Sequence, residues 1–307
     1  MTLATALSLG ETALKLGLIC SLTVLALFLS YSMLNVCDLS TDGCFTLGAA
    51  VGAAVAVSGH PFLSIIAAML AGICSGFVTG FLQTKMGVDS LLAGIIVNTG
   101  LYSINIAVMG GSSLINMNRT DTVFSMMKDV LEDTPLKGRT DIIVALIAVA
   151  AVVAFLVVFL KTRLGLAIRA TGNNEHMVRA LGANTNTTKL LGLMISNGLI
   201  AMSGALVTQS QGYADIKMGI GAIVIGLASI VIGEVILGRK PGFMFTLTAI
   251  IVGSILYRII VAVVLQLGLS TDDLKLLTAL LVGIALTVPV MVSKRKQIAT
   301  YKKLTKE

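Results

Sequence analysis

The chain has 307 residues and a net charge of +7; 56% of its residues are hydrophobic and only 12% are charged. Soluble domains carry about 25% charged residues, so this composition excludes an ordinary soluble enzyme and leaves no room for a separate soluble domain. The positive charge does not indicate a nucleic-acid partner, because the basic residues gather in segments that flank apolar stretches. We expect an all-α, polytopic helical membrane protein with one transmembrane domain over residues 1–307, embedded in a lipid bilayer.

Long apolar stretches with few charges predict about nine membrane spans, several of them short or broken. The second span follows directly on the polar run DLSTDG (38–43), and the seventh is interrupted by glycines between 219 and 233. Broken helices are typical of transporters, because irregular backbone within a membrane is tolerated only beside a cavity or packed protein. The predicted spans cover residues 15–34, 42–58, 62–83, 91–110, 141–160, 190–208, 219–237, 242–267 and 274–292.

Glycines recur four residues apart in the second and third spans. Gly48 and Gly52 form one such pair, and Gly72, Gly76 and Gly80 form two more in series. Small residues at this spacing let membrane helices approach closely, so we expect dense helix packing along both spans.

The distribution of Lys and Arg orients the spans. Residues 161–189 and the tail 293–307 are rich in basic residues, so the positive-inside rule places both in the cytoplasm. The longest segment on the other side is 111–140, whose middle, VFSMMKDVLED, is amphipathic. It either forms a helix on the outer face or is a solvated connector. With nine spans and a cytoplasmic tail, the N-terminus lies outside.

The segment 161–189 predicts a short amphipathic helix between two long spans. Gly172 ends the preceding segment, Asn173 is a suitable N-cap, Glu175 fits the first turn, and Gly182 fits the exit. Such a helix on the cytoplasmic side either docks into a soluble partner or is part of a solvated loop. Its apolar face would consist of Met177, Ala180 and Leu181.

Three motifs carry a family resemblance that covers about residues 15–292. They are DLSTDG (38–43), IRATGNNEHMVRALGANTNTTKLLGLMISNGLIAMSGAL (168–206) and GIGAIVIGLASIVIGEVILG (219–238). Together they resemble the permease subunits of ABC importers, in the family that includes the ribose and branched-chain amino acid permeases. The chain differs from the ribose type in lacking an additional N-terminal span and in the details of DLSTDG. It looks closest to a subgroup whose neighbouring binding proteins are often assigned to tryptophan or other aromatic amino acids.

The resemblance implies a permease in a bacterial plasma (inner) membrane that imports a small organic solute, an amino acid rather than a sugar. An external solute-binding (lipo)protein would deliver the solute, and an ABC ATPase would drive transport. The chain has no GxxxxGK[ST] run, so ATP and Mg²⁺ would bind to the partner ATPase, and the chain itself needs no cofactor. A second copy would complete the pathway as a homodimer. The residues expected to contact the ATPase are Asn173, Asn174, Glu175, His176, Met177, Arg179 and Leu181.

Four ionisable residues lie within or beside the predicted spans, where a charge is costly and normally faces a partner or a cavity. We expect Arg258 to form an intramembrane ion pair with Glu234 or Asp38, or else to contact the solute directly, while Asp42 lies at an interface. If Asp38 and Glu234 instead coupled transport to an ion gradient, the chain would be a stand-alone secondary transporter. The cysteines and histidines lack the spacing of metal ligands, so no metal site is expected.

Polar side chains on otherwise apolar spans are candidates for the translocation pathway. The alternative is that they form hydrogen bonds between helices. The candidates are Asn98, Asn105, Ser196 and Asn197 along the spans, with Gln209 and Gln211 at the external mouth.

Overall fold

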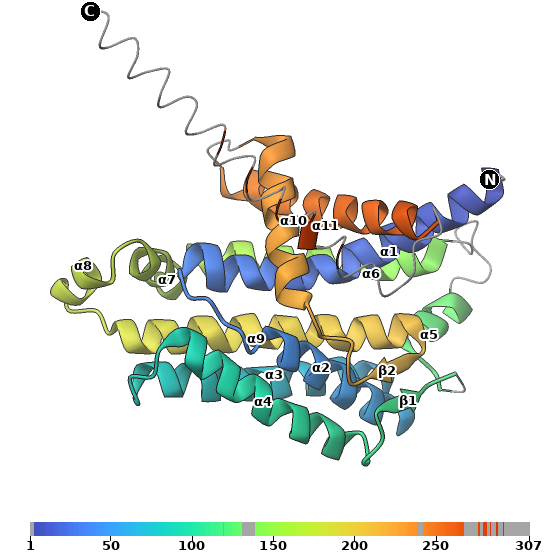
Figure 1. Cartoon of the computed structure of the whole chain (residues 1–307), viewed down its shortest axis with the longest axis horizontal. Helices are drawn as coiled ribbons and strands as arrows, with labels where there is room; N and C mark the ends of the chain where they lie inside the picture. Colours follow the sequence, from blue (N-terminus) through green and yellow to red (C-terminus); the bar gives the residue numbers. More distant parts are fainter. Residues whose placement is uncertain are drawn as a thin grey trace, which may run out of the picture.

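The computed structural model describes residues 3–118, 120–130, 139–238 and 242–266, with a few isolated positions between 276 and 291. The described chain is a bundle of long helices lying side by side (Figure 1). Each of the first eight predicted spans corresponds to a helix, and the ninth, 274–292, lies outside the described ranges. The span helices are α1 (Leu3–Leu27) with its extension η1 (Phe28–Met33), α2 (Thr41–Val57), α3 (Pro61–Thr84), α4 (Ser90–Val108), α6 (Thr140–Lys161), α9 (Thr185–Gln211), α10 (Ala222–Leu237) and α11 (Phe243–Gln266).

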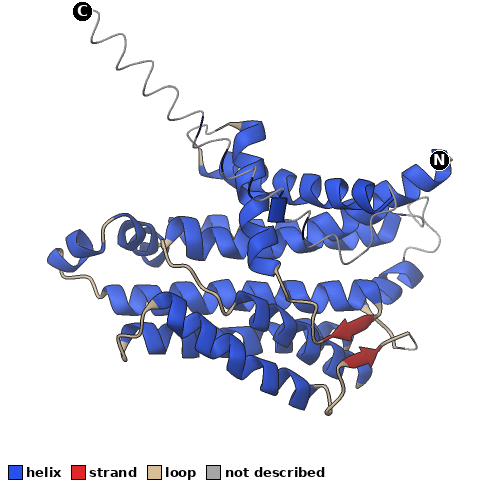
Figure 2. Cartoon of the chain, viewed as in Figure 1, coloured by secondary structure: helices blue, strands red, loops and turns tan. Residues whose placement is uncertain are grey.

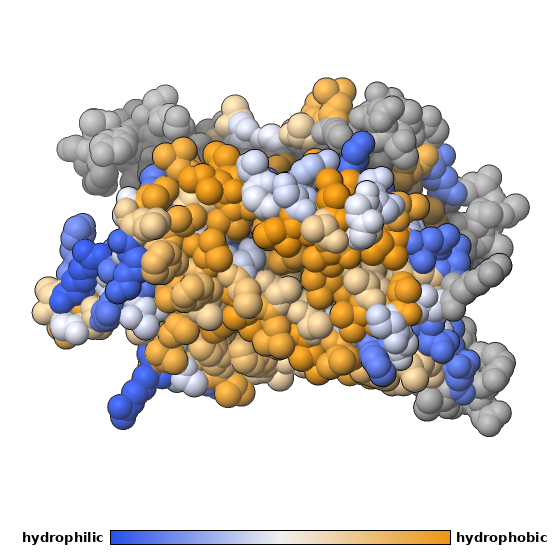
Figure 3. Space-filling model, turned by 90° about the horizontal axis from the view of Figure 1, so that it is seen from below, coloured by the Kyte–Doolittle hydropathy of each residue, from blue (hydrophilic) through white to orange (hydrophobic). Residues whose placement is uncertain are grey.

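The length and surface of the bundle fit a membrane protein. Six helices, counting α1 with η1, are long and apolar enough to cross a bilayer, while α2 and α10 are shorter. On one face a broad apolar surface separates two polar ends (Figure 3). The exposed side chains of α3 and α4 contribute to the apolar surface of the bundle, because lipid takes the place of water around them. They include Phe62, Leu63, Ile66, Leu70, Phe77, Leu91, Leu92, Ile95 and Ile96.

Helix α9 is largely buried at the centre of the bundle and packs on α2 and α3. Glycines make this contact close: a Cβ on Gly72 or Gly76 of α3 would collide with the backbone carbonyl of Asn197 or Leu193. Gly48 of α2 lies equally close to the backbone of α9. The spacing of four residues therefore confirms the packing expected from the sequence.

The two ends of the bundle carry different elements. At one end are the short helices α7 (Arg163–Asn173) and α8 (Glu175–Ala180). At the other end, strand β1 (Leu114–Asn116) pairs antiparallel with β2 (Tyr213–Asp215), and α5 (Val123–Val130) lies nearby (Figures 1 and 2). Helix α5 confirms a helix in the predicted amphipathic stretch, although 131–138 lie outside the described ranges. The first described residues of α1 lie at this second end (Figure 1).

The interruption predicted for the seventh span was wrong, because α10 is continuous from Ala222 to Leu237 through Gly226 and Gly233. Two helices nevertheless depart from the regular bundle. Helix α1 widens into the π-helix η1, after which Asn35 adopts a left-handed conformation (φ 55°) and the chain turns back into α2. Helix α10 crosses the long helices instead of running along them (Figure 1). π-Helical turns are frequent at functional sites, which makes the region around η1 a candidate site.

Candidate functional site

The break between η1 and α2 is held by a buried polar network around Asp38. The backbone N–H of Ser40 donates to Asp38 Oδ1 (2.8 Å), and Asn197 Nδ2 donates to Asp38 Oδ2 (3.0 Å). Thr79 Oγ1 of α3 donates to Ser40 Oγ (3.3 Å). Because α3 and α9 both contribute donors, the irregular backbone is fixed in place although it is buried.

Asp42, in the first turn of α2, holds the start of α10. Its Oδ2 accepts from the backbone N–H of Gly221 (2.9 Å), and its Oδ1 accepts from that of Ile223 (3.0 Å). Thr46 Oγ1 accepts from the N–H of Gly219 (3.2 Å). A carboxylate is favourable at a helix N-terminus, where backbone N–H groups lack partners within the helix. Asp42 thus lies at an interface, as expected, and positions the crossing helix.

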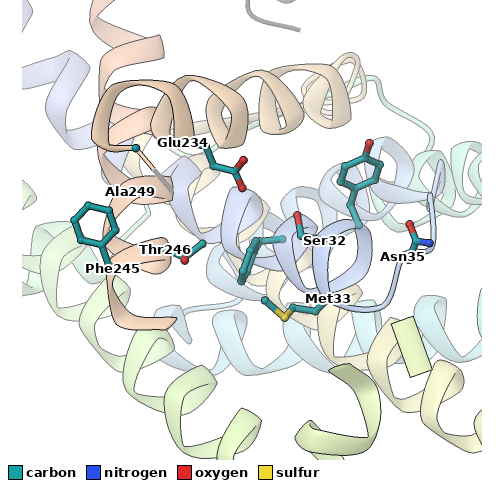
Figure 4. Close-up of a pocket in the computed structure, with 10 residues that line it drawn as sticks. Ser32, Met33, Asn35, Glu234, Phe245, Thr246 and Ala249 are labelled. Carbon is teal, nitrogen blue, oxygen red and sulfur yellow. The ribbon is translucent and has the colours of Figure 1, made fainter. Parts of the chain in front are cut away.

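A cavity of about 410 Å³ lies where η1, the end of α10 and the start of α11 meet (Figure 4). We call it the Glu234 cavity, because the Glu234 carboxylate points into the space between α10 and η1 (Figure 4). Its wall includes the left-handed Asn35 and the α10 C-cap Gly238 (φ 76°). The lining residues are Phe28, Tyr31, Ser32, Met33, Asn35, Glu234, Gly238, Phe245, Thr246 and Ala249.

The wall of this cavity contacts α7. The Arg169 guanidinium lies 5.9 Å from the centre of the Phe243 ring, a cation–π distance. The Phe243 ring is in turn 6.5 Å from that of Phe28 in the cavity wall. Gly172 of α7 packs against the carbonyl oxygen of Met33 so closely that a Cβ there would collide with it. A displacement of α7 would therefore bear directly on η1 and on the start of α11.

The segment between α6 and α9 forms two short helices where one was expected. Asn174, not Asn173, is the N-cap of α8, since its Oδ1 accepts from the N–H of Met177 (3.0 Å). The predictions for Gly172 and Asn173 were wrong because both residues complete the last turn of α7, whose start Thr162 caps. Gly182 does provide the exit, with a positive φ of 81°.

Glu175 connects α8 to the start of α9. Its carboxylate accepts from Lys189 Nζ (2.6 Å), Arg179 Nη2 (2.9 Å) and Thr185 Oγ1 (3.2 Å). The hydrogen bond from Lys189 holds the pKa of Glu175 below its ordinary value, with further help from the charge of Lys189. Arg179, which was expected to contact the ATPase, forms an ion pair within the chain, because Glu175 lies one turn before it.

The outer face of α8 is exposed. Met177 is 49% exposed and Leu181, directly after the helix, is 76% exposed, while Val178 is buried against the bundle. Ala180, His176 and Asn173 are also exposed. The apolar face predicted for the helix thus points outward, without a described partner in this chain.

Most of the predicted pathway residues form hydrogen bonds between helices. Ser196 Oγ donates to the carbonyl of Ala26 (2.8 Å), and Asn105 Nδ2 donates to that of Gly43 (3.2 Å). Gln209 is buried and bonds Pro61, Ser64 and Val123. Asn98 lies next to Gly43, and Gln211 is exposed at the end of α9. None of these residues lines the Glu234 cavity.

The expected ion pair of Arg258 requires correction. Arg258 Nη2 donates to Cys20 Sγ (2.9 Å), because α11 packs along α1 and brings the two side chains together. Asp38 is instead bound to Ser40 and Asn197, and Glu234 lines the cavity described above. Arg258 was expected to pair with Glu234 or Asp38, and the three residues in fact lie at three separate sites.

The sequence matches a known family of membrane transport proteins over most of its length. Residues 11–288 match the family described as the branched-chain amino acid transport system / permease component. The chain belongs to this family. It is a permease of the ABC importer type and a multi-pass membrane protein, in keeping with a bacterial plasma membrane. As such it is a transporter subunit rather than an enzyme.

Curated relatives of the permease agree with this family. The chain is 40% identical over 268 residues to a tyrosine transport system permease protein of Clostridioides difficile, covering 87% of the chain and 86% of the relative. It is 32% identical over 280 residues to the uncharacterised protein RP368 of Rickettsia prowazekii, covering 90% and 96%. A nucleoside ABC transporter permease of Lactococcus lactis is 26% identical over 160 residues, 49% of each chain. No solved structure matches the chain.

Sequence reasoning identified Glu234 but not the residues that surround it in the permease. Tyr31, Asn35 and Phe245 were missed, because each looks like an ordinary residue at the end of a span. A weak signal was available in SYSMLN (30–35), where polar residues interrupt the apolar run. Within the described ranges, no group of three or more His, Cys, Asp or Glu side chains is placed to hold a metal ion.

Proposed function

We propose that the permease imports an aromatic amino acid and that ATP hydrolysis on a separate ATPase subunit drives this import. The observation that carries the substrate class is the 40% identity, over most of both chains, to a permease named for tyrosine transport. The resemblance to a subgroup associated with tryptophan or aromatic amino acids supports the same class. Tyrosine and tryptophan are therefore the solutes to test first.

The exposed outer face of α8 supports docking of the ATPase. Met177 and Leu181 expose apolar surface at the end of the bundle that carries α7 and α8, and no described residue of this chain covers them. The Glu175–Lys189 contact fixes α8 to α9, so a push on α8 would reach the central helix of the bundle. The proposed contact residues are Asn173, Asn174, Glu175, His176, Met177, Arg179 and Leu181.

The proposal includes the partners of such a system. An external solute-binding (lipo)protein would deliver the solute at the end that carries β1, β2 and α5. ATP and Mg²⁺ would bind to the ATPase, and the chain, as a single transmembrane domain, would act as a homodimer. Asn98, Asn105, Ser196, Asn197, Gln209 and Gln211 would act mainly by holding the helices in register, since most of them are buried and hydrogen-bonded.

The first test is purification of the permease from native membranes in mild detergent, followed by mass spectrometry of the proteins that remain bound. We expect an ATPase in stoichiometric amount and ATP-dependent tyrosine or tryptophan uptake after reconstitution with the binding protein. The opposite result is a permease that purifies alone and transports in liposomes without ATP. That result would reject the importer and favour an ion-coupled secondary transporter.

A pair of variants tests the docking face. Met177→Ser combined with Leu181→Ser should reduce ATPase co-purification about tenfold or more, because the contact loses its apolar centre. Leu114→Ser is the matched control, since Leu114 is also exposed but lies in β1 at the opposite end. Equal ATPase recovery from both proteins would place the docking face elsewhere.

A further inference from the structure

We infer that a small cavity lined by Arg258 holds the carboxylate group of the amino acid during its passage through the permease. This inference rests on the proposed function and specifies where the solute is bound. The cavity, of about 50 Å³, lies between α1, α2, α10 and α11, and we call it the Arg258 cavity. It is separate from the Glu234 cavity, since the two share no lining residue.

The Arg258 cavity lies deep within the span formed by α1 and η1. Cys20 and Thr23, in its wall, are near the middle of the 25-residue span Leu9–Met33. Many transporters bind their solutes near the bilayer midplane, beside helices that begin or end there. Helix α10 begins at this cavity: its first residue, Ala222, lines it, and its N-cap Gly221 has a positive φ of 85°.

Arg258 brings a positive charge to this depth. A guanidinium group stays charged in proteins, and a charge within a membrane is costly unless a partner compensates it. Its Nη2 donates to Cys20 Sγ (2.9 Å), while its buried Nε has no hydrogen-bond partner in the described chain. Because a thiol is a weak acceptor, the guanidinium retains a donor and its charge for an anionic partner.

The chain supplies no carboxylate to this cavity from its described residues. The predicted ninth span, 274–292, which lies outside the described ranges, contains no Asp or Glu in its sequence. The acidic residues nearest to it, Asp272 and Asp273, follow the end of α11 at Gln266, which is about 12 Å along the helix from Arg258. An anion from outside the chain is therefore the fitting partner for the guanidinium.

Thr23 provides a second donor in the same cavity. Its side chain is 4% exposed, and its Oγ1 has no hydrogen-bond partner in the described chain. Buried hydroxyl groups are normally hydrogen-bonded, because an unpaired one costs free energy. The N–H groups of Gly221 and Ile223 at the start of α10 are already bound to Asp42. The two oxygens of a carboxylate would satisfy Thr23 and the free N–H of Arg258 together.

The size of the Arg258 cavity fits a carboxylate rather than a whole amino acid. One water-sized group needs about 10–15 Å³ of cavity volume, so 50 Å³ accommodates a group of a few atoms. The wall continues into apolar residues, Phe45, Met218 and Ile220, of which Ile220 is 59% exposed. The aromatic side chain of the solute would therefore lie against these apolar residues at the open side of the cavity.

Photolabelling tests the site without requiring transport. The probe is 4-azidophenylalanine, which carries both the carboxylate and an aromatic ring, applied to the permease–ATPase complex in nanodiscs. Mass spectrometry should place the label at Phe45 or within 218–226, along the apolar part of the wall. Excess tyrosine should reduce the labelling, whereas tyramine, which lacks the carboxylate, should not.

Variants make the test specific. Arg258→Gln removes the charge and should lower labelling about tenfold or more, since a charge-assisted hydrogen bond is lost. Arg258→Lys keeps the charge but not the planar fork, and should give an intermediate level. Thr23→Val removes the hydroxyl at nearly constant shape and should also lower labelling. Arg163→Gln, at the exposed start of α7, is the matched control and should label like the wild type. Melting in detergent would verify folding, and the tyrosine–tyramine comparison in the wild type decides the site if a variant does not fold.

Three results would overturn the inference: no label in these segments, labelling unchanged in a folded Arg258→Gln variant, or competition by tyramine equal to that by tyrosine. Equal competition by acetate would assign the cavity to small anions in general and would reject the solute site as well.

Uptake separates failure of this inference from failure of the proposed function. If the wild-type complex imports tyrosine and the label lies elsewhere, only the site is wrong. If no ATPase co-purifies, the importer is wrong, and the dependence of the label on Arg258 and on the carboxylate still decides the site.

Discussion

At the scale of single residues, the two carboxylates of DLSTDG have different roles. Asp38 accepts hydrogen bonds from Ser40 and Asn197 and thereby fixes the break before α2. Asp42, one helical turn later, accepts from Gly221 and Ile223 and holds the start of α10. A run of six residues thus positions both the break before α2 and the start of α10.

Asp42→Ala should destabilise the permease by about 1–3 kcal/mol, because the N–H groups at the start of α10 lose their acceptor inside the protein. Thermal unfolding in detergent would measure the loss. The control is Asp215→Ala, which removes an acceptor for the N–H of Lys217 in an exposed turn that water can replace. A similar loss in both variants would contradict the specific role of Asp42.

The Glu175 contact should depend on pH. Its pKa lies below the ordinary value of 4.5, so its stabilising effect is complete above pH 4.5 and is lost as the pH falls through the lowered pKa. The gain is at most about 1 kcal/mol, because the group is partly exposed. Hydrogen exchange of residues 175–189, corrected for intrinsic rates, should show protection falling in acid. Glu175→Gln should remove this pH dependence; a Gln variant that retains it would assign the effect to another group.

At the scale of elements, the contact between α7 and η1 connects the polar end of the bundle to the Glu234 cavity. It depends on Gly172, since any side chain there would meet the carbonyl of Met33. Close packing of this kind transmits a displacement because neither backbone can yield.

Gly172→Ala should therefore push α7 away from η1, at a cost of about 1–3 kcal/mol. Uptake should fall while the ATPase still co-purifies, because the outer face of α8 is unchanged. Gly100→Ala in α4 is the matched control, since a Cβ at Gly100 meets nothing within 4 Å. Normal uptake by Gly172→Ala would show that this contact does not carry the coupling.

The elements themselves were largely predictable. Eight apolar runs became eight helices, since burial in lipid leaves a helix as the simplest way to satisfy the backbone. The boundaries between α7 and α8 were not predictable, because Asn173 and Asn174 are equally good caps by composition. Asn174 is the N-cap of α8 because α7 continues through Gly172, which packs against η1, and ends at Asn173.

At the scale of the whole molecule, α8 and the β1–β2 pair lie at opposite ends of the apolar bundle (Figure 1). Residues 114–116 and 213–215, distant in sequence, pair as strands there. The positive-inside rule predicts that the α8 end is cytoplasmic, and this arrangement makes the prediction testable.

A membrane-impermeant maleimide should label Leu181→Cys only in inside-out vesicles and Leu114→Cys only in intact cells. Both leucines are exposed, at 76% and 47%. The native protein is the control, because Cys20 and Cys44 are buried but Cys37 is half-buried and Cys74 is exposed on α3, so labelling of the native cysteines must be measured and subtracted. If both variants were labelled from the same side, the α8 end and the β1–β2 end would not face opposite sides of the membrane, and the proposed topology would be wrong.

The sequence by itself determined the class, the spans, the close glycine contacts and the family, because these depend on composition, on local periodicity and on motifs read along the chain. The tertiary structure alone decided which polar groups meet. Arg258 donates a hydrogen bond to Cys20, and Asn197 donates one to Asp38. Glu234 lines one cavity together with Tyr31, Asn35 and Phe245. These contacts join residues far apart in the chain, and their choice depends on how the helices cross, which no local pattern records.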